Sequence, residues 1–349
     1  KKGEKELKAW CKASFLLIGI IFMFFLTACG GQESSSSTNE GDSASNEEKK
    51  DLKDVKIVLN WFPKAQHGGL YAAQENGLFE KNGLKVTIEP GGPQVSSIQM
   101  VASGSADFGL AHADQMVIAR NQGIELVAVA AAMQGSPQAL MFHKGKGIDD
   151  FDELNGRKVY IQPGITYWDF LKSKYNLSNV QELAYTGQHS NFISDVESVS
   201  QAFVTSEPFF LKKDGVDVET KLISDAGYNP YNVVLYVTKD YLEKNKETVK
   251  AFVDAFVEGW YLYKDSYEEI NKVIQKDNAD MELESLKFEA ETQVDFVYGG
   301  DAAEHGVGYM TEERWATLIK QLHDLGLLEK TFDAKEIFTT EYLPKHESK

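Results

Sequence analysis

Val55-Lys56-Ile57-Val58-Leu59-Asn60 begins the stretch of sequence that decides the fold. Its short run of apolar and β-branched side chains predicts a buried strand. Residues 69–75 then predict a short helix that ends at Asn76-Gly77, and residues 85–89 predict the next strand. Strands that alternate with helices in this way predict a mostly parallel sheet that is covered on both faces.

The same alternation continues through the next 50 residues. Gly91-Gly92-Pro93 predicts the start of a helix that runs to Gly104, because proline fits the first helical position and apolar residues recur at helical spacing. The remaining elements of this first unit are predicted as a strand at residues 107–111, a helix at 114–121 and strands at 126–132 and 139–142.

A second unit of the same kind begins near Lys144. Its predicted elements are a short helix at residues 148–154, a strand at 158–161, a helix at 167–175 that ends at Asn176, and strands at 202–205 and 218–224. Residues 233–237 predict a strand that returns to the first unit. From Lys239 onward the pattern is mostly helical, with an apolar face that includes Phe252, Phe256 and Trp260.

Two α/β units joined by two crossing segments form a hinged cleft, and such clefts bind small molecules. We assign residues 54–142 and 238–349 to lobe 1 and residues 143–237 to lobe 2. The hinge is expected near residues 142–144 and 236–239. The predicted fold class is therefore α/β, with a hinged cleft between two doubly wound lobes.

Composition and charge argue against several functional classes. The chain has 349 residues and a formal net charge of −17 at pH 7, which disfavours binding to nucleic acid. Its two cysteines are Cys11 and Cys29, so the sequence beyond them provides no disulfide, cysteine nucleophile or cysteine metal site. The seven histidines form no metal-ligand motif, and no phosphate-loop or Gly-x-Ser-x-Gly motif occurs. We predict no metal site and no catalytic residue.

Residues 1–53 indicate export and a membrane anchor. Lysines precede the apolar run at residues 14–25, which suits a signal peptide and is too short for a permanent membrane helix. Leu26-Thr27-Ala28-Cys29 follows and resembles a bacterial lipobox, so we expect cleavage before Cys29 and lipidation of that cysteine. Residues 1–28 are then a signal peptide and residues 29–53 a flexible tether. The alternative is an ordinary secretory signal in which Cys29 has no role.

A series of short motifs resembles one known family. The motifs are Asn60-Trp61-Phe62-Pro63, HGGLYAA at residues 67–73, NGLF at 76–79, NGL at 82–84, PGG at 90–92, ADFG at 106–109, DELNGR at 152–157 and SEP at 206–208. In these motifs the chain is similar to substrate-binding proteins of ABC importers that include the thiamine-pyrimidine precursor binding proteins. The resemblance covers roughly residues 54–345 and implies a two-lobed, type II-like periplasmic-binding-protein fold. Other members of the family bind riboflavin or alkanesulfonates.

One eukaryotic branch of this family consists of enzymes that make the thiamine pyrimidine. The resemblance implies that these synthases carry a lysine for pyridoxal phosphate two residues after the glycine of the Asp-x-Gly strand, and a donor histidine four residues later. The matching positions in this chain are Ala111 and Gln115. Alanine cannot form the imine that this cofactor needs. We therefore expect no enzyme and no cofactor.

The candidate ligand contacts of lobe 1 follow its predicted strands, at the edge where doubly wound sheets place ligands. Trp61 can stack on a flat heterocycle and Asn60 can hydrogen-bond to a ring edge, although burial of Trp61 in the core is the alternative. The N–H groups of Gly91 and Gly92 can hold an acceptor or an anion, or the two residues form a structural turn.

Three further candidates in lobe 1 lie at predicted helix starts. His67 either contacts the ligand or caps the helix that it opens. His112 and Asp114 follow a strand end in the same way, and Asp114 is alternatively the N-cap of the next helix.

Lobe 2 contributes Tyr167, Tyr185, Asn191 and Glu207, and Tyr228 comes just before the returning strand. Glu207 ends a predicted strand and precedes a proline, so it should face the space between the lobes. A carboxylate there can accept hydrogen bonds from an aminopyrimidine edge and would repel a sulfonate. The alternative for Glu207 is compensation of a helix dipole, and Tyr228 either walls the cleft or stiffens the hinge.

These observations predict a lipid-anchored solute-binding component of an ABC importer at the extracytoplasmic face of the cell membrane. The expected ligand is a small flat heterocycle, a formylaminopyrimidine-like thiamine precursor. Riboflavin and an alkanesulfonate are the alternatives, and for the sulfonate we identify no basic residue in the cleft. A pyrimidine precursor synthase is the alternative from a different class. We expect a monomer that delivers its ligand to a permease and its ATPase and binds no nucleic acid.

Overall fold

The computed structural model describes residues 51–346. The predicted signal peptide, the lipidation site at Cys29 and most of the predicted tether lie outside the described residues. None of the helices in the described part is both long enough and apolar enough to cross a membrane.

The first of two five-stranded sheets has the order β2-β1-β3-β10-β4. Its strands are β1 (Lys53–Val58), β2 (Leu84–Glu89), β3 (Phe108–Ala111), β4 (Leu126–Met133) and β10 (Asn232–Thr238). β1 pairs in parallel with β2 and β3, whereas β10 runs antiparallel between β3 and β4. The predicted strands of this sheet and the strand that returns to it are therefore confirmed.

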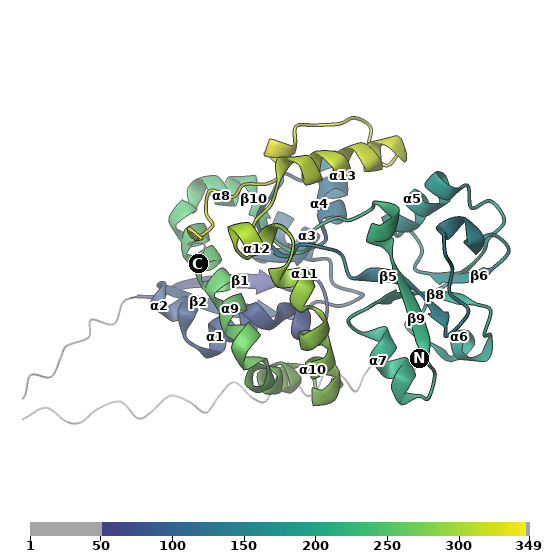
Figure 1. The fold of residues 1–349 in the computed structure, drawn as a ribbon. Helices are drawn as coiled ribbons and strands as arrows, with labels where there is room; N and C mark the ends of the chain where they lie inside the picture. The colour runs from purple at the N-terminus through teal and green to yellow at the C-terminus, as the bar shows by residue number, and fades with distance from the viewer. Residues whose placement is uncertain (1–50, 347–349) are drawn as a thin grey trace, which may run out of the picture. The chain divides into compact units, whose positions relative to one another are not determined.

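The second sheet repeats this arrangement with the order β7-β6-β8-β5-β9. Its strands are β5 (Gln138–His143), β6 (Lys158–Ile161), β7 (Gln181–Ala184), β8 (Val199–Phe203) and β9 (Val218–Leu222). β6 pairs in parallel with β7 and β8, and β5 runs antiparallel between β8 and β9. In each sheet the antiparallel strand is the one that enters from the other sheet. Figure 1 shows β1, β2 and β10 on one side and β5, β6, β8 and β9 on the other.

The chain crosses between the sheets earlier than the sequence predicted. β5 belongs to the second sheet, so the first crossing lies at residues 134–137 and not at 142–144. β10 belongs wholly to the first sheet, so the return lies at residues 227–231 and not at 236–239. An apolar strand carries no mark of the sheet it joins, which is why the sequence misplaced both boundaries.

We name the two halves by these observed crossings. Lobe 1 consists of residues 51–133 and 232–346, and lobe 2 of residues 138–226. The two crossing segments are joined to each other, because the Ser136 N–H donates to Asn229 Oδ1 over 2.9 Å.

Helices cover both faces of the first sheet. On one face, α1 (Gly68–Glu75) packs against the long α9 (Lys246–Asp277), whose predicted apolar face is buried. A Cβ atom on Gly69 would lie 2.4 Å from the Trp260 ring, so this close packing requires glycine. The other face is covered by α4 (Ala113–Asn121) and α13 (Glu312–Asp324).

The start of one lobe 1 helix differs from the prediction. α3 (Ser97–Ala102) begins after Ser96, whose Oγ accepts a hydrogen bond from the Gln99 N–H. Pro93 lies in the turn before it, which the Val95 N–H closes on the Gly92 carbonyl over 3.0 Å. Ser96 therefore supplies the cap that the sequence assigned to the Gly-Gly-Pro segment.

In lobe 2, α5 (Thr166–Tyr175) ends at Asn176 as predicted, with Asn176 in the left-handed conformation at φ 49°. β7 and α6 (Ser190–Ser194) were missed, because their side chains are mostly exposed and show no apolar pattern. The remaining helices are α2 (Leu78–Lys81), α7 (Glu207–Lys213), α8 (Lys239–Lys244), α10 (Leu283–Thr292), α11 (Val294–Tyr298) and α12 (Asp301–His305), with short 3-10 turns at Ala65–His67, Phe151–Leu154, Ile223–Ala226 and Ala334–Glu336.

Candidate functional site

The carboxyl ends of the parallel strands in both sheets carry most of the predicted ligand contacts. Asn60 and Trp61 follow β1, His112 follows β3, and Glu207 comes shortly after β8. Two contacts bring these edges together across the lobes. The Lys64 ammonium lies 3.2 Å from Ser206 Oγ, and the rings of His112 and Phe203 have centroids 6.3 Å apart. The two lobes therefore meet at the strand ends that the sequence marked.

Asn60 is held by His67. The Lys64 backbone N–H donates to His67 Nδ1, so Nε2 carries the proton of the neutral ring and donates to Asn60 Oδ1 over 2.9 Å. Burial, with a smaller effect of the Lys64 charge, lowers the pKa of His67 to about 3. His67 is 1% exposed and makes no side-chain cap to α1. The structure thus places His67 against the amide oxygen of Asn60.

Trp61 lies outside the core. Its side chain is 39% exposed, and its ring meets the ring of Phe62, which is 45% exposed, edge to face at 5.7 Å. The alternative of a buried Trp61 is therefore wrong. These two rings form an accessible aromatic surface directly after β1.

Gly91 supports the loop that carries Trp61. Its N–H donates to the Trp61 carbonyl over 3.1 Å, and a Cβ atom at Gly91 would lie 2.3 Å from the Leu59 carbonyl oxygen. The N–H is therefore engaged in a structural turn. Gly92 has φ 155°, and a Cβ atom there would lie 3.0 Å from the Phe62 ring, so the same loop packs on it.

Asp114 joins the lobes at a buried contact, which we call the Asp114 cluster: Asp114, Thr166 and Tyr228. Thr166 Oγ1 donates to Asp114 Oδ2, and the Tyr228 hydroxyl lies 2.8 Å from Thr166 Oγ1 and 3.2 Å from Asp114 Oδ2. Burial chiefly, and then the Asp114 charge, raises the pKa of Tyr228 well above its usual value.

The structure around the Asp114 cluster bears on two questions that the sequence left open: whether Asp114 caps α4, and whether Tyr228 lies on the cleft wall or in the hinge. The N-cap of α4 is His112, whose pKa burial lowers, and Asp114 occupies the first turn. Tyr228 is 0% exposed and lies in the return crossing, which favours the hinge alternative over a place on the cleft wall.

Glu207 lies close to both predicted tyrosines of lobe 2. Its Oε2 accepts the Phe203 N–H over 2.7 Å. Burial raises the pKa of Glu207, and the nearby Lys64 charge opposes that rise. Burial raises the pKa values of Tyr167 and Tyr185 as well, and the Glu207 charge is the next cause for each. The charge of Glu207 thus influences the ionisation of both Tyr167 and Tyr185.

Asn191 is the one predicted residue that the described contacts leave apart from the others. It is exposed in α6, and its carbonyl accepts the Ser194 hydroxyl over 3.0 Å.

Sequence reasoning missed two residues of the site, Lys64 and Glu289. The Lys64 ammonium lies 3.2 Å from Glu289 Oε1, and Glu289 Oε2 accepts the Ala65 N–H over 3.3 Å. Burial raises the pKa of Glu289, and Lys64 opposes that rise. Lys64 is therefore a basic residue near the predicted ligand contacts that the sequence analysis did not identify. Only the family motif around Lys64 could have pointed to it, since Glu289 is 225 positions away.

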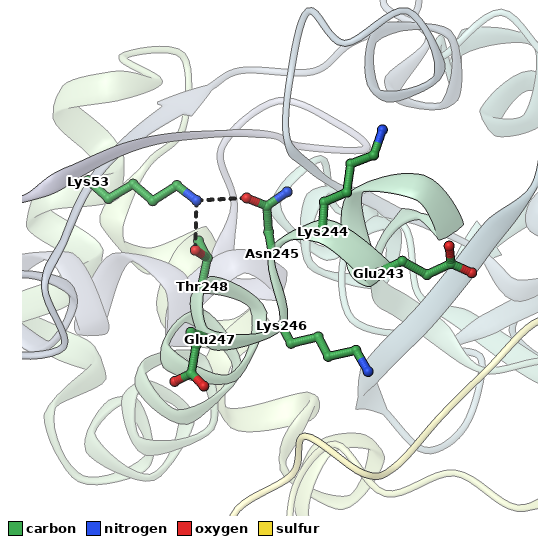
Figure 2. A pocket seen from close by; sticks show the side chains of 7 residues that line it. All are labelled: Lys53, Glu243, Lys244, Asn245, Lys246, Glu247 and Thr248. Atoms are coloured by element: carbon green, nitrogen blue, oxygen red, sulfur yellow. Dashed lines mark hydrogen bonds between the residues drawn. The ribbon is translucent and has the colours of Figure 1, made fainter.

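Two surface pockets lie apart from these strand ends. Figure 2 shows the larger, of about 300 Å³, where Lys53 at the amino end of β1 donates to Asn245 and Thr248 over 2.8 Å each. The other, of about 250 Å³, lies against residues 304–309 and 340–346. Neither contains a predicted residue. Within residues 51–346, no group of three or more histidine, cysteine or acidic side chains is arranged to hold a metal ion.

The family described as NMT1/THI5 like has a model that matches residues 64–269. The chain belongs to the NMT1/THI5-like family. It is 25% identical over 347 residues to the formylaminopyrimidine-binding protein of Halalkalibacterium halodurans, covering 94% of this chain and 98% of that one. It is 27% identical over 222 residues to the Saccharomyces cerevisiae 4-amino-5-hydroxymethyl-2-methylpyrimidine phosphate synthase THI13, covering 58% of this chain and 64% of the synthase. The NMT1/THI5-like chain thus spans less than two thirds of that enzyme.

Solved structures establish the fold of this NMT1/THI5-like protein. The periplasmic aliphatic sulphonate binding protein SsuA of Escherichia coli aligns with a TM-score of 0.64 at 16% identity, covering 85% of this chain and 94% of that one. A ligand-binding component of an ABC-type import system from Staphylococcus aureus aligns with a TM-score of 0.61 at 13% identity, covering 85% and 100%. The predicted family and the two-lobed periplasmic-binding-protein fold are therefore confirmed.

Proposed function

We propose that this chain is the solute-binding component of an ABC importer and that it captures a thiamine pyrimidine precursor of the formylaminopyrimidine type. The observation that carries the proposal is that Asn60 and Trp61 of lobe 1 and Glu207 of lobe 2 all follow strand ends, at the edges where Lys64 reaches Ser206 across the lobes. A relative that matches over nearly its full length and is named a formylaminopyrimidine-binding protein supports it.

The residues suit a flat, nitrogen-rich ring. The exposed Trp61 ring provides a face for stacking. The amide nitrogen of Asn60 can donate to a ring nitrogen, since Oδ1 is already bonded to His67. The Glu207 carboxylate can accept hydrogen bonds from an exocyclic amine, as carboxylates do from the amine of a nucleobase. Ligand between the lobes would join these three groups and favour the closed form.

The remaining parts of the proposal come from the sequence. The lipobox-like segment at residues 26–29 supports a lipid anchor at Cys29 on the extracytoplasmic face of the membrane. From there the protein would act as a monomer and hand its ligand to the permease and ATPase of the importer. A Cys29→Ser variant should lose lipid labelling and leave the membrane fraction.

Catalysis of pyrimidine synthesis is disfavoured by one position. Ala111 ends β3, is fully buried and stands where the synthases carry their cofactor lysine, so no amine is available there to form an imine.

A sulfonate ligand is disfavoured by the charges near the site. The basic residue near the candidate site is Lys64. Its charge is already balanced by the carboxylate of Glu289, with which it pairs, and by that of Glu207.

Calorimetric titration of the full chain with three ligand classes tests the proposal. A formylaminopyrimidine should bind and raise the unfolding temperature by mass action, while an alkanesulfonate and riboflavin should not. Binding of the alkanesulfonate without the pyrimidine would overturn the proposal in favour of a sulfonate carrier. A protein that is yellow as purified would point to a flavin.

A further inference from the structure

Lys64 belongs to a group of residues that we call the Lys64 cluster: Lys64 and Glu207, which are half-buried, and Ser206 and Glu289, which are buried. Lys64 lies between β1 and the 3-10 turn Ala65–His67 in lobe 1, and its ammonium reaches Ser206 of lobe 2 and Glu289 of α10. The side chain of Lys64 is 20% exposed and that of Glu289 is 4% exposed. A single cation therefore connects both lobes inside a desolvated environment.

The Lys64 cluster lies where α7 of lobe 2 packs against α10 of lobe 1. The rings of Phe209 and Phe288 pack there with centroids 5.5 Å apart. Lys213, the last residue of α7, pairs with Glu282, the N-cap of α10, over 2.6 Å. That pair is exposed, at 50% and 53%, whereas the Lys64–Glu289 pair is mostly buried. The Lys213–Glu282 pair thus joins the two lobes in contact with solvent, whereas the Lys64–Glu289 pair lies within lobe 1 and is largely shielded from solvent.

The Lys64 cluster contains two acids for one base. Burial raises the pKa values of both Glu207 and Glu289, the charge of Glu207 raises that of Glu289 further, and Lys64 lowers both. The charge of Glu207 in turn raises the pKa values of Tyr167 and Tyr185 of lobe 2, and the charge of Glu289 raises that of Tyr263 of α9. Without the lysine, the charges of the two carboxylates would oppose each other without compensation, which favours protonation of one of them. A protonated carboxyl group donates a hydrogen bond as well as accepting one, so it no longer selects for an amine.

We propose that Lys64 is a positioning residue that draws lobe 2 onto lobe 1 through Ser206 and keeps Glu207 a hydrogen-bond acceptor, so that the site selects ligands with an amino edge. The selectivity half of this inference rests on the proposed function, whereas the closure half does not. Lys64 acts through its neighbours, so its substitution should change ligand preference and lobe closure more than the stability of the fold.

Three variants of the full chain test the proposal: Lys64→Gln, Lys64→Arg and, as the matched control, Lys213→Gln. Calorimetry measures the affinity of each for a formylaminopyrimidine and for its analogue with a 4-oxo group in place of the amine. In Lys64→Gln, affinity for the amino ligand and preference over the 4-oxo analogue should both fall by about tenfold, as for loss of one hydrogen bond to a charged group. Lys64→Arg should restore most of the preference, and Lys213→Gln should leave both values unchanged because its pair is exposed.

Small-angle scattering of the ligand-free proteins tests the closure half independently of the ligand. Lys64→Gln and Ser206→Ala should each have a larger radius of gyration than the wild type, whereas Lys213→Gln should not. Ser206→Ala retains the lysine, so its preference for the amino ligand should persist. Should Lys64→Gln unfold, Ser206→Ala and Lys64→Arg still test the two halves.

The outcomes separate this inference from the proposed function. Unchanged ligand preference in Lys64→Gln, or scattering of Lys64→Gln and Ser206→Ala that matches the wild type, would overturn the role of Lys64. A wild-type protein that binds no aminopyrimidine would instead overturn the proposed function, and the scattering comparison would then decide whether Lys64 closes the lobes.

Discussion

The Asp114 cluster and the Lys64 cluster both join lobe 1 to lobe 2, but their chemistry differs. In the Asp114 cluster a carboxylate accepts hydrogen bonds from two hydroxyl groups, one of which belongs to the return crossing. In the Lys64 cluster an ammonium connects residues of three elements that are far apart in the chain, and none of them is a crossing segment. The first contact lies beside a crossing and can persist while the lobes turn, whereas the Lys64–Ser206 contact of the second must separate when the lobes move apart. The Asp114 cluster thus suits a hinge, and the Lys64 cluster suits a contact that holds the lobes closed.

The largest difference should appear on acidification, through His67 beside the Lys64 cluster. Burial and the Lys64 charge lower the pKa of His67 from 6.5 to about 3. The unfolded chain therefore binds the proton more readily, and stability is lost as the pH falls from 6.5 toward 3. His67→Gln should remove this dependence, so between pH 6.5 and about pH 4.5 the wild type should lose between about 2 and 3 kcal/mol more than the variant. Urea unfolding of both proteins at both pH values measures this difference in the free energy of unfolding.

Comparison with the variant isolates the histidine, because other groups titrate in the same range. Burial raises the pKa values of Glu207 and Glu289 in the fold, so their stabilising contribution is present at low pH and is lost as the pH rises. This effect opposes that of His67 and is shared by both proteins. Equal pH dependence of wild type and variant would contradict a neutral, buried His67.

Removing the carboxylate of the Asp114 cluster should be the next largest effect. Asp114→Ala leaves the hydroxyls of Thr166 and Tyr228 without their acceptor at a buried position, which should lower the free energy of unfolding by about 2 kcal/mol. Asp240→Ala is the matched control, because Asp240 also occupies a first helical turn but its side chain is 73% exposed. The control should change stability by less than about 0.5 kcal/mol. Chemical denaturation of both variants measures the difference, and equal losses would refute the importance of the cluster.

Trp61 should affect binding without affecting either cluster. Its ring is 39% exposed, whereas that of Trp315 is fully buried in lobe 1. Trp61→Ala should weaken formylaminopyrimidine binding by about tenfold through lost stacking and leave the unfolding temperature unchanged. Trp315→Ala should instead destabilise the fold by about 3 kcal/mol or more. Calorimetric titration and thermal unfolding of both variants distinguish the roles, and unchanged affinity in Trp61→Ala would remove Trp61 from the site.

The sequence predicted the fold well where burial leaves a pattern. β1, β6 and α5 lie within two residues of their predicted ranges, because apolar runs, helical spacing and the stop at Asn176 are local signals. β7 and α6 carry mostly exposed side chains and gave no such signal. Membership of β5 in the second sheet depends on its pairing with β8 and β9, which are far along the chain.

The sequence predicted where the candidate site residues lie along the strands, but not which of them contact each other. Strand ends marked Asn60, Trp61 and Glu207, because parallel strands present their carboxyl ends to ligands. That His67 contacts Asn60, or that Lys64 meets Glu289 from 225 positions away, follows only from packing in three dimensions. A motif identifies which residues a site has, and the fold determines which of them contact each other.

The smallest expected change in the free energy of unfolding comes from removing the hydroxyl of Tyr228. This change also tests most directly whether the two clusters differ in role. Tyr228→Phe keeps the ring packed against Phe170, with centroids 5.2 Å apart, and removes only the hydroxyl near Asp114 and Thr166. The free energy of unfolding should fall by about 1 kcal/mol, because Thr166 still donates to Asp114. Since the hinge is retained, the variant should bind ligand with unchanged affinity and compact on binding as the wild type does. A larger radius of gyration without ligand, as expected for Ser206→Ala, would show that the Asp114 cluster also holds the lobes closed, and the distinction between hinge and closure would fail.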